Sequence, residues 1–529
     1  MQTATRTILN VVILLAATLP WLNPFAPGPS AAVVPLLFSL FCVAVLLSGY
    51  SIRSSVVPIN RLLNVAVLSW LVAGIASSCI GLLQYFGATE SFYPWVNRTE
   101  LGQAFANLRQ RNQFASLTNI GLVALLWLAS SCQTDAIEAR LVHWRWRGLI
   151  VLTAVLLAMG NASSSSRTGL AQLFLVCGLF WIWGGWRSSL VRSTLLLSLL
   201  GYGVAMVALP WLAKLDLSIY GMAARLTSGD EACGSRLVLW SNVLHLIAQK
   251  PWLGWGWGEL DYAHYSTLYG GPRFCDILDN AHNLPLQLAV ELGVPFALLV
   301  CGGLTWWITC QKPWRERDAS RQMAWAVIAV ILLHSMLEYP LWYGPFQMAF
   351  GFCLGLLWPT RQQSTESPKQ VKDAKSLPNT VPAQSIQALA AMVLIAFTAC
   401  AAWDYQRISQ IYLSPELREA AYRDDTLAKI RSSWLFNDQV KFAELILTPL
   451  TPENAKWTYA TGTDLLHYSP EPRVIEKVIE SAVLLGRDDD ALLHLTRYRA
   501  AFAEDYARWA KRNGQGNTDT KTGLPTLKN

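Results

Sequence analysis

The feature that most constrains this chain is a succession of long apolar stretches. An α-helix needs about 20 mainly apolar residues to cross the hydrocarbon part of a bilayer. The stretches that reach or approach this length are 7–25, 31–50, 62–86, 114–132, 148–161, 168–185, 192–213, 283–310, 322–340, 342–359 and 386–403. Because helices satisfy their own backbone hydrogen bonds in lipid, the sequence predicts an all-α polytopic membrane protein with about 11 transmembrane helices.

The composition agrees with burial in a membrane. Only 15% of the residues are charged, whereas a soluble domain carries about 25%. The 24 tryptophans fit the same interpretation, because tryptophan collects where membrane meets water. The formal net charge of +7 is modest, and we attribute it to orientation in the membrane rather than to binding of nucleic acid.

The distribution of lysine and arginine predicts the orientation. Met1–Pro20 could pass for a signal peptide, but a second apolar run begins at Ala31, and we interpret the first run as an uncleaved signal-anchor helix. With the N-terminus inside, the basic residues of most short connections also lie inside, as the positive-inside rule requires. The exceptions are Arg98, Arg109 and Arg111, which precede the fourth span. The C-terminus is then predicted to lie outside.

Two regions are not predicted to cross the membrane. Residues 214–282 form a long outside loop, and its tryptophans and tyrosines argue against disorder. Residues 404–529 have helical periodicity, with a helix start at Ser414 and a break at Gly486. Such paired helices suggest a small soluble tetratricopeptide-like domain, although no clean repeat of about 34 residues is present. The predicted domains are therefore 1–403, transmembrane with its loop, and the helical tail.

The outside loop contains Cys233 and Cys275, whereas the other cysteines lie in or beside apolar spans. A bacterial periplasm permits disulfides. A bridge would close a loop of about 40 residues, worth roughly 3–4 kcal/mol in the chain-entropy description. We predict this disulfide; two free buried thiols are the alternative.

Polar clusters at the outside ends of the spans are candidate functional sites, because polar groups at membrane depth are costly. Asn112 and Gln113 enter the fourth span in "RNQF", where Asn112 could also be an ordinary helix cap. Arg167 follows "SSSS" at a helix start, a combination suited to an anion. The alternative for Arg167 is a tight turn with a snorkelling side chain.

The outside loop contributes a third cluster. Arg236, Trp240 and Leu244 share one face of a predicted amphipathic helix that Pro251 ends. Arg236 on an interface helix would suit a phosphate. The tryptophans of this segment are equally compatible with anchoring at the headgroup level.

His282 lies where the loop enters a membrane helix. A neutral imidazole there could accept a proton, and Asp276, Asp279 and Glu291 are candidate orienting partners. A single histidine is usually only an N-terminal helix residue, but two arginines elsewhere in the outside regions favour a functional role.

The fifth cluster is "HSMLEYPLWYGP", with Glu338 and Tyr339 at the outside end of a span. A corner marked by proline, with aromatic anchors, is the alternative. The sequence contains no Gly-rich phosphate loop, His-Glu-x-x-His motif or Asp-x-Asp-like cluster. No metal or other cofactor is therefore expected.

The order "RNQFASL", "SSSRTGL", "SRLVLWSN…PWLGWGWG", "AHNLPLQLAVELG" and "HSMLEYPLWY" resembles the O-antigen ligase superfamily. The last two motifs and the helical tail look most like its protein O-oligosaccharyltransferase branch, the pilin-glycosylating enzymes. The resemblance covers roughly 1–360 in architecture and is most specific from 233 to 345. It implies a metal-independent glycosyltransferase of the bacterial inner membrane, with its active site facing the periplasm.

The resemblance also implies roles for particular residues. His282 matches the family's essential histidine, and Arg167 and Arg236 match the arginines that hold the diphosphate of an undecaprenyl-diphosphate-linked oligosaccharide. Gln113 and Tyr339 look like important polar residues of the pilin-glycosylating branch, with Tyr343 as an alternative to Tyr339. The implied partners are this donor, membrane lipid and an acceptor protein such as pilin.

Three other functions remain open at this stage. An O-antigen ligase would use the lipid A core as its acceptor, and a repeat-unit polymerase would extend the glycan itself. The soluble tail favours a protein acceptor, because helical modules of this kind commonly bind polypeptides. A lipid or glycan transporter would tend to show inverted repeats and charges near the bilayer midplane, which the sequence lacks.

Overall fold

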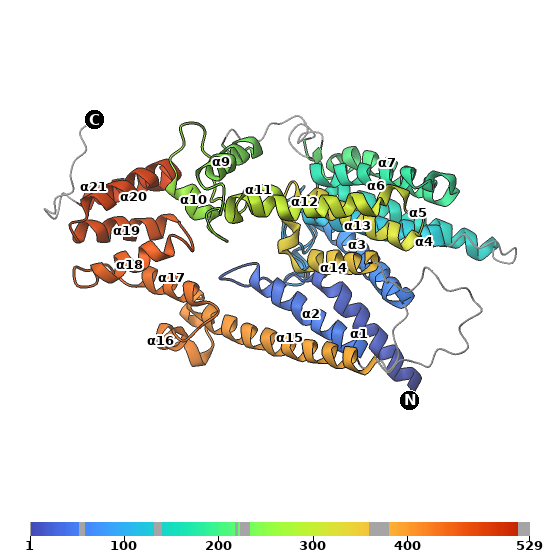
Figure 1. The fold of residues 1–529 in the computed structure, drawn as a ribbon, viewed down its shortest axis with the longest axis horizontal. Helices are drawn as coiled ribbons and strands as arrows, with labels where there is room; N and C mark the ends of the chain where they lie inside the picture. Colours follow the sequence, from blue (N-terminus) through green and yellow to red (C-terminus); the bar gives the residue numbers. More distant parts are fainter. Residues whose placement is uncertain are drawn as a thin grey trace. The chain divides into compact units, whose positions relative to one another are not determined.

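The computed structural model describes residues 2–51, 59–131, 140–216, 221–222, 233–358 and 380–516. Over these residues the protein is all-helical, with 75% helix and no strand. It divides into two compact units (Figure 1). The first unit combines 1–228 with 305–403, and the second combines 229–304 with 404–529. From residue 229 onwards, the long loop therefore belongs to the same unit as the tail.

The first unit is a bundle of apolar helices (Figure 1). Its complete helices are α1 (Gln2–Leu22), α2 (Val33–Ser51), α3 (Ile59–Tyr85), α4 (Arg111–Ser131), α5 (Arg140–Ser163), α6 (Arg167–Ile182), α7 (Ser189–Leu212), α13 (Ala319–Ser335) and α14 (Gly344–Leu357). It also holds the end of α12 (Val294–Gln311) and most of α15 (Thr380–Ser409).

Helix α4 is the centre of this bundle. It packs against α3, α5, α6 and α13, and most of its residues are buried. Small residues allow the close packing: a β-carbon on Gly160 would collide with Ser78 of α3, and one on Gly169 would collide with Ala115 of α4. This is the usual way in which membrane helices approach one another.

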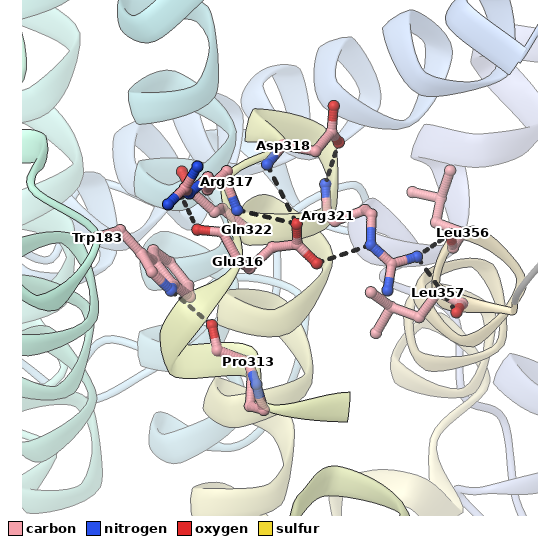
Figure 2. A network of polar contacts seen from close by, with 9 residues as sticks. All are labelled: Trp183, Pro313, Glu316, Arg317, Asp318, Arg321, Gln322, Leu356 and Leu357. Carbon is pink, nitrogen blue, oxygen red and sulfur yellow. Dashed lines mark hydrogen bonds and ion pairs between the residues drawn. The ribbon is translucent and has the colours of Figure 1, made fainter. Parts of the chain in front are cut away.

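One end of the bundle is fixed by a polar corner before α13 (Figure 2). Asp318 caps α13 by accepting the backbone N–H of Arg321 at 2.9 Å. The Arg321 side chain donates to Glu316 at 2.7 Å and reaches the Leu357 carbonyl at 3.3 Å, at the end of α14. Trp183, after α6, donates to the Pro313 carbonyl at 2.8 Å. The corner thus joins the ends of three helices.

Apolar helices account for the predicted spans. Among the described residues, seven helices are long and apolar enough to cross a membrane, and four shorter apolar helices cover Thr7–Leu22, Arg167–Ile182, Ala319–Ser335 and Gly344–Leu357. The chain is a multi-pass membrane protein, and the count of eleven crossings stays a prediction.

The predicted single span over 283–310 is wrong, because it is two helices, α11 (Leu284–Leu292) and α12. Gly293, with φ +89°, separates them, and a β-carbon there would strike the Trp252 carbonyl. The Val294 N–H donates to the Pro251 carbonyl at 2.8 Å. The Gly- and Trp-rich turn of the loop therefore breaks the helix by packing against it.

The second unit contains the loop helices α9 (Arg236–Gln249), α10 (Leu260–Ser266) and α11, and the tail helices. The tail helices are α16 (Thr426–Ile430), α17 (Asn437–Leu447), α18 (Ala455–Leu465), α19 (Pro472–Leu484), α20 (Asp488–Ala501) and α21 (Ala503–Gly516). Loop and tail share a core in which Tyr265 of α10 packs with Leu465, Ile475 and Tyr498. The tail therefore docks on the loop.

The tail begins differently from the prediction. The expected helix from Ser414 is wrong: short 3-10 turns occupy Pro415–Leu417 and Ala420–Tyr422 instead, and Ser414 makes no side-chain capping bond. Further along, the predicted break at Gly486 is confirmed, since this residue has φ +68° between α19 and α20.

Candidate functional site

In the first unit, two of the predicted site residues bind each other. Asn112, in the first turn of α4, donates to one carboxylate oxygen of Glu338 at 3.1 Å, and Gln110 donates to the other at 2.9 Å. Glu338 lies just beyond α13 and is only 5% exposed. Burial of a carboxyl group is tolerated when both oxygens accept hydrogen bonds. The corner at 334–345 is thereby joined to the start of α4.

The side-chain amide of Asn112 also connects Glu338 to the start of α6. Ser166 donates its hydroxyl to the Asn112 side chain at 2.6 Å and accepts the Gly169 N–H at 3.0 Å as the cap of α6. Arg167 is the first residue of α6, and its side chain is exposed. Asn112, Glu338 and Arg167, which are distant in sequence, therefore lie around one hydrogen-bonded cluster.

Sequence reasoning missed a buried polar network below this cluster. Ser116 contacts His334 Nδ1 at 2.9 Å and accepts from Gln172 at 2.8 Å, and Asn119 donates to Gln172 at 3.2 Å. These side chains come from α4, α6 and α13. Such groups inside an apolar bundle specify which helices pair, because each needs its partner in the absence of water.

Gln113 faces a separate cavity of the first unit. Its side chain is 1% exposed, and its amide nitrogen finds no acceptor among the described residues. The cavity has a volume of about 210 Å³, and Arg109, Tyr343 and Gln113 are among its lining residues. Tyr339 stacks on Tyr343 with ring centroids 5.9 Å apart. Tyr343, the alternative considered for Tyr339, is therefore the tyrosine that lines the same cavity as Gln113.

In the second unit, the backbone holds His282 in an unusual conformation. His282 has φ +50°, which few residues other than glycine adopt. Its N–H donates to the Asn280 side chain at 2.8 Å. The preceding residue, Ala281, donates its N–H to Gln287 at 2.7 Å and accepts from the Trp240 indole at 3.1 Å. A backbone fixed in this way gives the imidazole a defined starting direction.

The acidic residues near His282 have different environments. Asp276 and Asp279 are exposed, and Asp279 is close enough to interact electrostatically with His282. Glu291 is 3% exposed and accepts the Gly258 N–H at 3.0 Å. Glu291 therefore ties the Gly- and Trp-rich turn to α11, whereas Asp279 interacts with His282.

Arg236 has the same local setting as Arg167. Each arginine is the first residue of a helix and follows a serine cap; Ser235 accepts the Val238 N–H at 3.3 Å. The free N–H groups at a helix start and a guanidinium both favour a phosphate. Cys233 and Cys275 form a disulfide with Cα atoms 5.3 Å apart, which ties the segment before α9 to the segment before His282.

Three family profiles match the chain. One described as "Protein glycosylation ligase" matches 104–129, one described as "O-Antigen ligase" matches 152–301, and one described as "Virulence factor membrane-bound polymerase, C-terminal" matches 322–515. The first two cover the starts of α4, α6, α9 and α11, where the candidate residues other than Glu338 and Tyr339 lie.

Two proteins of Acinetobacter baylyi (strain ATCC 33305 / BD413 / ADP1) are similar to the chain. A general O-oligosaccharyltransferase is 26% identical over 376 residues, which are 69% of this chain and 61% of that protein. A ComP-specific O-oligosaccharyltransferase is 23% identical over 259 residues, 48% of this chain and 44% of that protein. The chain thus spans under two thirds of the length of either relative. These matches confirm the resemblance of the chain to the O-antigen ligase superfamily, in its protein O-oligosaccharyltransferase branch.

Proposed function

We propose that the protein is an O-oligosaccharyltransferase, which moves a glycan from undecaprenyl diphosphate to serine or threonine of periplasmic proteins such as pilin. The observation that carries this proposal is the fixed His282 backbone beside α11, within the part of the chain matched by the O-antigen ligase profile. The names of both relatives support a protein acceptor over other acceptors.

The reaction follows from the chemistry of the three proposed residues. The acceptor hydroxyl oxygen bonds to the anomeric carbon of the glycan while the bond from that carbon to the diphosphate oxygen breaks. His282 takes the proton of the hydroxyl, which is otherwise a weak nucleophile. Arg167 and Arg236 stabilise the negative charge that develops on the departing undecaprenyl diphosphate. The reaction is proposed to take place at the periplasmic face of the inner membrane.

The other predicted residues are proposed to bind substrate. Gln113 supplies a buried amide donor to its cavity, next to the cation of Arg109. Asn112 and Glu338 are proposed to contact substrate beside Arg167, because Asn112 bonds both to Glu338 and to Ser166, the residue before Arg167. Tyr339 would act through its stacking on Tyr343.

An O-antigen ligase or a repeat-unit polymerase is the second candidate. The observation in its favour is that two of the three matching profiles bear those descriptions. Both alternatives use the same donor chemistry and differ in the acceptor. A transporter would need no base at His282.

The test is intact-mass measurement of periplasmic proteins from cells with and without the chain, together with the pattern of lipopolysaccharide bands. A protein that carries added glycan only when the chain is present is the expected result. A change in lipopolysaccharide alone would contradict the proposal in favour of the ligase.

A further inference from the structure

The Gly- and Trp-rich turn that follows α9 presents large apolar side chains on the surface of the second unit. The turn comprises residues 250–258, and its Trp252, Leu253 and Trp257 are 75%, 85% and 63% exposed. Apolar side chains that gather on a surface mark an interaction site. We infer that this turn is inserted into the membrane surface, where the three side chains lie at the boundary between phospholipid headgroups and acyl chains.

Backbone hydrogen bonds hold the turn beside the junction of α11 and α12. The Trp255 N–H donates to the Val290 carbonyl, in the last turn of α11, at 2.8 Å. The N–H of Val294, the first residue of α12, donates to the Pro251 carbonyl, also at 2.8 Å. The turn is therefore fixed at the point where α12 begins.

Helix α12 identifies what surrounds the turn. It begins one of the stretches that are long and apolar enough to cross a membrane. All residues of α12 are described, and Ala297 alone among them is buried. In its first two turns, Phe296, Leu298 and Leu299 are exposed. Apolar side chains that remain exposed on a spanning helix contact lipid, so the lipid starts near the first residues of α12. The turn is bonded to that position and therefore meets the same lipid.

The residue types in the turn suit the surface of a membrane. Tryptophan concentrates at the level of the headgroups, because its ring is apolar and its N–H is polar. The sequence 250–258 contains one cation, Lys250, and no acidic residue. The Lys250 ammonium lies over the Trp255 ring, 4.0 Å from its centroid. A cation beside exposed aromatic and aliphatic groups complements anionic phospholipid.

The acidic groups beside the turn are bonded within the protein. Glu291 is 3% exposed and accepts the Gly258 N–H at 3.0 Å. Glu259, the residue after the turn, contacts His467 with its carboxylate at 2.7 Å. Neither carboxylate is left without a partner that would have to be replaced when the turn meets headgroups.

The composition of the turn disfavours the other possible partners. A glycan site needs several placed polar groups to orient the sugar. Apart from Lys250 and the indole N–H groups, the turn has no polar side chain. A protein bound to Trp252 and Leu253 would have to share its place with the lipid around the start of α12. A phospholipid surface fits both observations.

Insertion of the turn would also hold His282 near the membrane. Helix α11 begins two residues after His282 and ends beside the turn. Its nine residues span roughly 14 Å, at about 1.5 Å per residue. The segment that carries His282 is therefore tied to the membrane surface through a short helix.

Quenching by lipid tests the insertion in the full chain, reconstituted in vesicles of phosphatidylcholine and phosphatidylglycerol. A fluorescent amino acid replaces Leu253 in one protein and Leu492 in another. Leu492 is the matched control, because it is 51% exposed on α20 of the same unit. Bromine atoms in the upper acyl chains should quench the probe at 253 at least about threefold more than the probe at 492, since interfacial side chains reach roughly 5–10 Å into the boundary. Equal bromine quenching at both positions would overturn the inference.

Cross-linking in the same vesicles identifies the partner. A photoreactive residue in place of Leu253 should attach to phospholipid, and one in place of Leu492 should not. Attachment at 253 mainly to protein, a second copy of this chain included, or to an added lipid-linked glycan would contradict the inference. Neither measurement needs glycan transfer, so its result is separate from that of the transfer assay.

Removal of the apolar side chains gives a third test. Trp252→Ser combined with Leu253→Ser should raise the quenching of a probe at 257 by iodide in the water at least about twofold. Leu492→Ser combined with Leu493→Ser should leave it unchanged. The side chains at 252 and 253 are exposed, so the unit should stay folded, and the Cys233–Cys275 disulfide is the control for folding. Unchanged iodide quenching at 257 in the first variant would contradict insertion of the turn.

Discussion

At the residue scale, the two arginines and the histidine of the proposed reaction share one feature, which is that local hydrogen bonds fix the backbone to which each side chain is attached. Arg167 and Arg236 are first residues of serine-capped helices. His282 has a left-handed backbone held by Asn280. A side chain attached to a fixed backbone loses little conformational entropy when it binds substrate. Preorganised sites lower the activation barrier of the reaction in this way.

His282→Asn separates catalysis from folding. Asparagine tolerates positive φ better than alanine does, so this variant should keep the loop intact. Loss of a general base should lower the transfer rate by about 10²–10⁴. The measurement is glycosylation at matched membrane abundance, with protease resistance of the second unit as the control. Near-normal transfer would remove His282 from the mechanism.

The sequence pointed to many of these residues but to few of their contacts. Polarity at the ends of apolar spans identified Asn112 and Glu338, yet their hydrogen bond joins residues that no local pattern connects. The network of Ser116, Gln172 and His334 gave no signal, because a single polar residue inside an apolar span is ambiguous until its partner is known. Which side chains form hydrogen bonds between helices depends on how the helices pack, and a local sequence pattern does not contain that information.

At the element scale, the contact between α10 and the tail is the main addition to what the sequence predicted. Tyr265 and His494 form a hydrogen bond of 2.9 Å between loop and tail. Hydrophobic periodicity predicted the tail helices but not what they pack against. The hydrophobic pattern also led us to predict one span where the protein has α11 and α12. Both helices are apolar, and Gly293 alone does not predict a break.

The loop–tail contact should be sensitive to acid. Burial lowers the pKa of His494 from 6.5 to about 4. The unfolded chain therefore takes up a proton below pH 6.5 that the folded chain resists, so stability present above pH 6.5 is lost as the pH falls towards 4. Burial also lowers the pKa of His264, to about 3, so this residue adds to the loss of stability in acid.

His494→Gln should reduce this acid sensitivity, because glutamine can still accept from Tyr265 but does not titrate. Thermal unfolding of the purified full chain at pH 7.5 and pH 5 is the measurement. The parent should lose more stability than the variant on acidification. An identical loss in both would show that His494 is not protonated on unfolding. Burial raises the pKa of Asp261 to about 7. The contribution of Asp261 to stability therefore falls as the pH rises, so acidification increases it in the parent and in the variant alike.

At the scale of the whole molecule, the described chain is a membrane bundle and a second unit built from a loop and a tail. The length of the apolar stretches was sufficient to predict a multi-pass protein. Backbone N–H and C=O groups without hydrogen bonds are so costly in lipid that few structures other than helices can cross it. The joining of the loop to the tail could not be predicted, since the two segments are separated by more than a hundred residues of sequence.

The orientation can be tested with alkaline phosphatase fusions. This enzyme needs disulfides, which form in the periplasm and not in the cytoplasm. A fusion after Gln363 should be inactive, and a fusion after Asp404 should be active, because the positive-inside rule places these positions on opposite sides. Activity at Gln363, or none at Asp404, would contradict the predicted topology.

The central claim is that this chain itself transfers a glycan from a lipid diphosphate to a protein. The most direct measurement is reconstitution of the purified full chain in vesicles with an undecaprenyl-diphosphate-linked oligosaccharide and a candidate acceptor, followed by intact mass analysis. The account predicts an added mass equal to the glycan on a serine or threonine with the parent chain, and none with His282→Asn. Transfer that is equal with both proteins, or that reaches only lipid, would contradict it.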